Sequence, residues 1–152
     1  MSMQQIIQTV RSFGGALELA PETGSEHPEI AWDDHFFYYS PDGAVPQNTQ
    51  PYATIVTKDY PDDALSRLDD DNRWRLNIHV GKAAFTQLIG ESPTDFAARD
   101  FSETDVIMPH PVYGPLGWVA IVNPGDNTTE VALGLLKDAH ENERRRIERR
   151  TR

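Results

Sequence analysis

Residues 73–80 read RWRLNIHV, and this stretch decides the fold. Two kinds of residue alternate along it: Trp74, Leu76, Ile78 and Val80 are apolar, and Arg73, Arg75, Asn77 and His79 are polar. Strict alternation predicts a β-strand, because successive side chains of a strand point to opposite sides. Strands with one apolar and one polar face are typical of antiparallel sheets covered on one side. We therefore expect a sheet whose second face is solvated or meets a partner.

Further strands are predicted on both sides of this one. They lie at 16–19, 52–58 and 118–122, and two more meet at a turn within 29–39. The residues of these runs are β-branched, aromatic or aliphatic, and turn signals such as SPDG at 40–43 bound them. Residues 109–117 contain too many Pro and Gly for regular structure.

Helices are predicted at both ends of the chain and after the central strand. The first spans 3–13, because Ser2 and Gln5 have capping-box spacing and Gly14 supplies a stop. A second helix is predicted at 82–89, and a further short helix is predicted to begin after the N-cap Ser92. The last helix opens at Asn127 and loses its apolar face near Ala139. The order predicts an α+β fold: a single, mainly antiparallel β-sheet packed on one face by the N- and C-terminal helices.

Length and charge indicate one acidic domain with a basic end. We expect residues 1–140 of the 152 to form a single domain, and 141–152 to be an Arg-rich extension, helical or frayed. That extension has six Arg and three Glu, a net charge of +3. Because the whole chain has a net charge of −10, residues 1–140 carry −13. Such a body disfavours nucleic-acid binding.

The composition excludes disulfide-stabilised, thiol-dependent and membrane-spanning classes of protein. Without cysteine the chain has no disulfide framework and no thiolate chemistry. Its longest apolar run, 118–122, is far shorter than the ~20 residues that span a bilayer, so we expect a cytoplasmic protein with no membrane partner.

Several segments together resemble an uncharacterised bacterial family. They are FFY at 36–38, ATIVTKDYP at 53–61, SRLD at 66–69, RLN at 75–77 and PHPVYGPLGWVAIVNPG at 109–125. The family is a domain of unknown function common in actinobacteria, and the match covers about residues 5–140. The resemblance implies no activity, substrate or catalytic residue.

The chain is also similar, more distantly, to MmcQ/YjbR-like proteins. The shared features are the order of elements and a late strand with Trp118 that leads into the terminal helix. This resemblance implies an α+β fold of the kind seen in frataxin-type domains. A role in DNA binding has been suggested for some of those proteins, and the charge of the body argues against it here.

The polar face of 73–80 is the first candidate site. Arg75, Asn77 and His79 project in one direction about 7 Å apart, and a neighbouring strand adds Lys58. Arginine and lysine side chains there would bind a carboxylate or phosphate. The alternative is a solvated sheet face or a dimer surface.

The second candidate is His110, which two prolines hold in extended backbone. It would act as general base with Tyr113 as a donor and Asp59 as the carboxylate that orients it. The alternative is a turn residue bonded to backbone.

No complete motif for a metal, phosphate or dinucleotide is present. The sequence therefore predicts no metal and no cofactor.

Three functions remain open. The first is a module that binds an anionic small molecule or a partner protein, including a second copy of the chain. The second is a small cofactor-independent enzyme that uses His110. The third is a nucleic-acid-associated protein that acts through its Arg-rich end.

Overall fold

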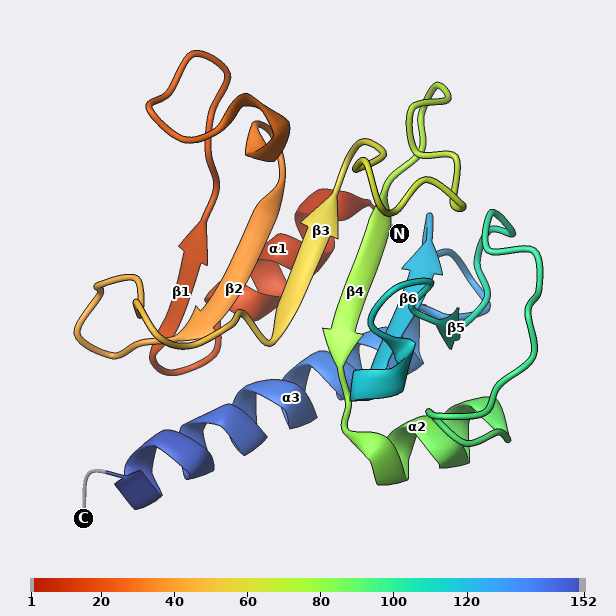
Figure 1. The fold of residues 1–152 in the computed structure, drawn as a ribbon. Helices are drawn as coiled ribbons and strands as arrows, with labels where there is room; N and C mark the ends of the chain where they lie inside the picture. The colour runs from red at the N-terminus through yellow and green to blue at the C-terminus, as the bar shows by residue number, and fades with distance from the viewer. Residues whose placement is uncertain (1, 151–152) are drawn as a thin grey trace.

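An antiparallel sheet runs through the centre of the computed structural model, which describes residues 2–150 (Figure 1). Its six strands are β1 (Ala16–Leu19), β2 (His35–Tyr39), β3 (Ala53–Val56), β4 (Arg75–His79), β5 (Met108–Pro109) and β6 (Trp118–Val122). They lie in the order β1-β2-β3-β4-β6-β5. The strand predicted from the alternation at 73–80 is therefore β4, between β3 and β6.

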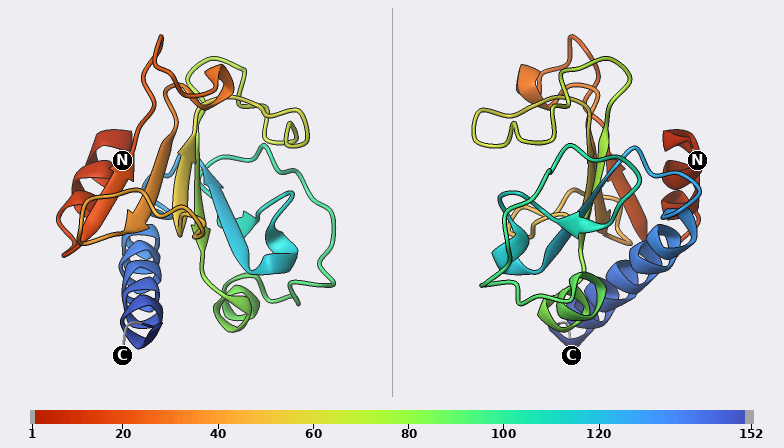
Figure 2. Two further views of the ribbon diagram at one scale, coloured as in Figure 1. Left: turned by 60° about the vertical axis from the view of Figure 1, so that its left-hand side comes forward. Right: turned by 90° about the vertical axis from the view of Figure 1, so that its right-hand side faces the viewer.

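The helices and the long loops lie on different sides of this sheet. The helices are α1 (Met3–Arg11), α2 (Lys82–Ile89) and α3 (Thr129–Arg150). Figure 2 shows α1 and α3 on one side, and the loops that follow β3 and α2 on the other. The predicted α+β fold with terminal helices on the sheet is confirmed.

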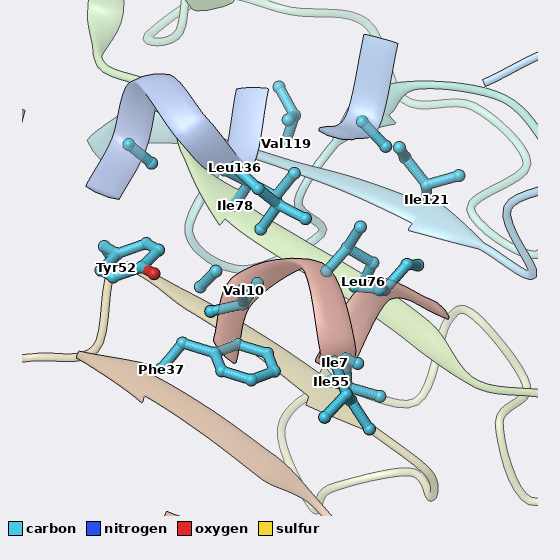
Figure 3. Close-up of a cluster of buried hydrophobic side chains, with 14 of the residues drawn as sticks. Ile7, Val10, Phe37, Tyr52, Ile55, Leu76, Ile78, Val119, Ile121 and Leu136 are labelled. Atoms are coloured by element: carbon cyan, nitrogen blue, oxygen red, sulfur yellow. The ribbon is translucent and has the colours of Figure 1, made fainter. Parts of the chain in front are cut away.

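The apolar face of β4 lies in the core, as its alternation predicts. Leu76 and Ile78 are fully buried beside Ile55 of β3 and Ile121 of β6 (Figure 3). The helices cover this layer with a few apolar side chains: Ile6, Ile7 and Val10 of α1 and Leu136 of α3. Burial of an aliphatic side chain contributes about 1.5–3 kcal/mol, so this layer is the main source of stability.

Local signals account for the helix ends. The Ser2 hydroxyl accepts from the amide of Gln5, and the Gln5 side chain accepts from the amide of Ser2, which completes the predicted capping box. Helix α2 ends at Gly90, whose φ of 78° lies in the left-handed region that glycine adopts without strain.

Three expectations about local structure were wrong. Residues 109–117 are not wholly irregular, because Pro109 pairs with Val119 in β5 and Gly114–Leu116 forms a short 3₁₀ helix. The start of 29–39 forms a short 3₁₀ helix, Glu29–Ala31, because Asp33 turns the chain with a φ of 68° before β2 begins. No helix follows Ser92, because its hydroxyl accepts from the amide of Thr94 and its carbonyl from that of Asp95, which closes a tight turn.

Helix α3 continues well beyond the last apolar position expected for it. Arg144 pairs with Glu141 and Glu148, and Arg146 pairs with Glu143, at helical spacings of three and four residues. These pairs stabilise the helix up to Arg150 without an apolar face. Arg152 lies outside the described residues.

Within 2–150 the structure contains no helix with the length and apolar character needed to cross a bilayer.

Candidate functional site

The polar face of β4 is buried at two of its three positions. Arg75 is 1% exposed and Asn77 is 2% exposed, whereas His79 is exposed. The expectation of a solvated face was wrong here, because the loop that follows β3 and the connection between β5 and β6 fold over it and bring in Asp63 and His110. A buried arginine needs partners for its charge and its N–H groups.

Those partners surround Arg75 on every side. Its Nη1 and Nη2 donate to Oδ1 and Oδ2 of Asp63 at 3.0 and 2.5 Å. Nη1 also donates to the hydroxyl of Ser66 at 3.0 Å, and Nε donates to Oδ1 of Asn77 at 2.7 Å. Burial favours the protonated carboxyl of Asp63, but the hydrogen bonds and charge of Arg75 outweigh it and lower its pKa.

The ring of His110 is held neutral against this ion pair. Its Nδ1 accepts from the amides of Val112 and Tyr113, both at 3.0 Å, so the proton of the neutral ring lies on Nε2. Nε2 lies 3.1 Å from Nη2 of Arg75, a contact between two N–H groups in this tautomer, and 3.7 Å from Oδ2 of Asp63. Burial, together with the charge of Arg75, lowers the pKa of His110 to about 3 against the opposing effect of Asp63.

A cavity of about 580 Å³, here called the sheet pocket, lies over this face of the sheet. Aromatic residues from four parts of the chain line it: Phe36, Tyr38, Tyr60, Tyr113 and Trp118. Its polar lining consists of Gln50, Thr54, Asp62, Asp63, Arg75, Asn77 and His110. Pockets of 300–1,000 Å³ with a mainly apolar lining and a few polar groups are typical of small-molecule sites.

Two hydroxyl groups in the sheet pocket have hydrogen-bonding capacity to spare. Thr54, opposite Asn77 in the β3–β4 register, accepts from Nδ2 of Asn77 at 3.0 Å, which leaves its own proton to donate. Tyr38 is 8% exposed, and its hydroxyl bonds to no other residue within 2–150. Burial raises the pKa of Tyr38, so the hydroxyl stays protonated and can donate.

The structure gathers four of the seven sequence-predicted site residues. Arg75, Asn77, His110 and Tyr113 line the sheet pocket. His79 lies outside it, 3.1 Å from the carbonyl of Leu116 through Nε2 and with its ring against Trp118.

Lys58 and Asp59 serve other parts of the structure. Lys58 donates to the carboxylate of Asp34 and to the backbone carbonyl of Trp32, both in the segment that precedes β2. Asp59 accepts from the amide of Leu68 at 2.8 Å, which fixes that loop. The carboxylate that reaches His110 is Asp63, not Asp59.

A family model with the description "Family of unknown function (DUF6194)" matches residues 1–152. The chain belongs to this family. No curated protein and no solved structure matched in the other two comparisons. The similarity to MmcQ/YjbR-like proteins therefore stays a prediction.

Sequence reasoning missed Tyr38, Thr54 and Asp63. For the first two a signal was present: Phe36 and Tyr38 of β2, and Thr54 and Val56 of β3, alternate with residues of the core face. Asp63 belongs to a loop between strands, and no local pattern distinguishes it from its acidic neighbours.

Acidic residues cluster in the sequence at 33–34, 59–63 and 69–71, and a metal site could be assembled from them only across strands; the structure does not gather them into one. Within 2–150 no three His, Asp or Glu side chains have an arrangement that would hold a metal ion. Asp34, the most buried carboxylate among them, accepts from Thr57, Lys58 and Tyr60. Asp34 thereby helps to hold Tyr60, which lines the sheet pocket.

Proposed function

We propose that the protein binds a small organic molecule in the sheet pocket. The observation that carries this proposal is the aromatic lining of the pocket around the hydroxyl of Tyr38, which has no hydrogen-bond partner among the described residues. A ligand that accepts a hydrogen bond from this hydroxyl takes the place of water in the pocket, and its apolar body covers the aromatic rings.

The position of the aromatic residues indicates the shape of the ligand. Phe36 and Tyr38 lie on β2 and Trp118 on β6, with β3 and β4 between them. Adjacent strands are separated by ~4.8 Å, so the aromatic walls stand about 14 Å apart along the sheet. A ligand with a flat or apolar body fits between them, and its polar groups meet Thr54 and Tyr38.

The basis for an anionic ligand is weaker than the sequence suggested. Arg75 and Lys58 were its proposed cations, and both are occupied by carboxylates of the chain, Asp63 and Asp34. Lys58 also lies outside the sheet pocket. The sheet pocket therefore recognises its ligand by shape, by aromatic contacts and by hydrogen bonds to hydroxyl groups.

The geometry around His110 favours binding over acid–base catalysis. The lone pair on Nδ1 is used by two backbone amides, and Nε2 carries its proton next to the guanidinium of Arg75. A general base needs a free lone pair and a pKa near the working pH. We infer that His110 holds the loop against the ion pair.

The Arg-rich end gives little support to nucleic-acid binding. Arg144 and Arg146 are already paired with glutamates of the same helix. Affinity for phosphates depends on cations that are free to replace counterions.

A thermal-shift screen over metabolites tests the proposal, because a ligand of the native state raises the melting temperature. The hit is then measured with Tyr38→Phe and with Tyr39→Phe, the adjacent residue of β2, which faces His140 on the helix side. We expect Tyr38→Phe to weaken binding about 5- to 10-fold and Tyr39→Phe to leave it unchanged. Equal binding by both variants and by the wild type would place the site elsewhere and overturn the proposal.

A further inference from the structure

We propose that the ligand of the sheet pocket is an organic cation, such as an aromatic molecule that carries an ammonium group. This inference rests on the proposed function and adds the charge of the ligand to it. It starts from the charged side chains of the lining, which are Asp62, Asp63 and Arg75.

The positive charge of the pocket is already matched. Arg75 is 1% exposed, and its N–H groups donate to Asp63, Ser66 and Asn77. His110 is the other side chain of the lining that could carry a positive charge. Its burial and the charge of Arg75 keep the ring neutral at pH 7. An anion would have to displace Asp63 from Arg75, which means breaking a buried ion pair.

The negative charge of the pocket is not matched. Asp63 cancels Arg75, which leaves the carboxylate of Asp62. Asp62 is exposed on the pocket lining, and it forms no hydrogen bond or ion pair with any residue within 2–150. The charged side chains of the lining therefore sum to −1, and the one without a partner among the described residues is an exposed carboxylate.

The aromatic lining suits the same kind of ligand. The rings of Tyr113 and Trp118 lie side by side, with centroids 6.5 Å apart and planes tilted by 53°. Tyr113 is half exposed, so its ring is open to a ligand. A cation over the face of a Trp or Tyr ring is attracted by the electrons of the ring, by about 0.5–2 kcal/mol.

The field of the whole protein acts in the same direction. The net charge is −10, and most of the arginines that offset the acidic residues lie in 141–152, five of them on the C-terminal part of α3 (Figure 1). A negative surface raises the local concentration of cations and lowers that of anions at its clefts.

The test uses three probes that share one indole ring: tryptamine, a cation; tryptophol, which is neutral; and indole-3-propionate, an anion. Each is titrated into ¹⁵N-labelled full-length protein, and the Kd is taken from the amide shifts of pocket residues. We expect tryptamine to bind about 3-fold more tightly than tryptophol and about 10-fold more tightly than the anion.

Asp62→Asn and Asp126→Asn form a matched pair of variants. Each removes one exposed carboxylate, but Asp126 precedes α3 and does not line the pocket. Asp62→Asn should bring tryptamine within 2-fold of tryptophol, and Asp126→Asn should leave the preference intact.

The outcomes separate the two proposals. If all three probes shift the pocket residues with equal Kd, or if the anion binds most tightly, the inference about charge is wrong and the proposed binding pocket stands. If no probe shifts pocket residues at millimolar concentration, both fail, because an aromatic pocket of this size would accept indole.

Discussion

The guanidinium of Arg75 and the carboxylate of Asp63 form a two-point ion pair between the central strand and the loop that follows β3, with N–O distances of 3.0 and 2.5 Å. Arg75 is fully buried and the Asp63 side chain is 10% exposed. The pair therefore joins the sheet to the loop that closes the sheet pocket. Its loss would affect both the stability of the fold and the shape of the site.

Asp63→Ala leaves the charge of Arg75 buried and unpaired. We expect it to lower the free energy of unfolding by about 3–5 kcal/mol, measured by urea denaturation. The double variant Asp63→Ala/Arg75→Met should lose about 2 kcal/mol less than the sum of the single variants, because the unpaired charge is gone. The exposed pair Arg67–Asp70 supplies the control: Asp70→Ala should leave stability nearly unchanged. Similar effects of Asp63→Ala and Asp70→Ala would contradict this view of the ion pair.

His110 accepts two backbone amides through one ring atom, and a shorter polar side chain can do the same. The Oδ1 of asparagine takes nearly the place of Nδ1, so His110→Asn should cost about 1 kcal/mol. His110→Ala leaves the amides of Val112 and Tyr113 unpaired and should cost about 2–3 kcal/mol. Chemical denaturation of both variants distinguishes this role from simple packing, for which the two losses would be alike.

The lowered pKa of His110 makes stability depend on pH. The unfolded chain takes up a proton below about pH 6.5, whereas the folded chain does not until about pH 3, so stability is lost as the pH falls through this range. Between pH 7.5 and 5.0 the wild type should lose about 2 kcal/mol more than His110→Asn. Urea titrations at several pH values measure the difference. Parallel curves for the two proteins would show that His110 has the same pKa in the folded and the unfolded chain, which would contradict the lowered value.

Gly117 lies where the chain enters β6, next to the pocket residue Trp118. Its φ is +89°, and a Cβ there would come within 2.8 Å of the carbonyl carbon of Gly81. Gly117→Ala should therefore lower the free energy of unfolding by about 2 kcal/mol or more. Gly134 of α3 has open space around it, and Gly134→Ala should raise stability by about 0.5–1 kcal/mol. Thermal unfolding measures the change in stability of each variant, which should be negative for Gly117→Ala and positive for Gly134→Ala. An alanine at 117 that leaves stability unchanged would contradict the tight approach to Gly81.

The sheet and its terminal helices could be predicted because their signals are local. The alternation at 73–80 identifies the core residues Leu76 and Ile78, and the capping pair Ser2 and Gln5 gives the start of α1. The length of α3 could have been predicted as well, because the spacing of Arg144 from Glu141 and Glu148 is visible in the sequence. Apolar periodicity alone underestimates a helix stabilised by ion pairs.

The interior of the candidate site could not be predicted from local patterns. Polar residues in a strand normally face solvent, and Arg75 is buried only because Asp63 and His110, 12 and 35 residues away, fold onto it. Those contacts depend on the path of two connections over the sheet, one between β3 and β4 and one between β5 and β6. The sequence therefore identified Arg75 and His110 as candidates but not the contact between them.

Chemical-shift mapping of the hit from the thermal-shift screen tests the central claim most directly. If the sheet pocket is the binding site, the largest amide shifts will fall at Thr54, Asn77, Tyr113 and Trp118, and Tyr38→Phe will raise the Kd about 5- to 10-fold. A second cavity lies between α2 and α3, where Ala84, Leu135 and Arg145 line it. Shifts centred on that cavity, with no effect of Tyr38→Phe, would contradict the claim.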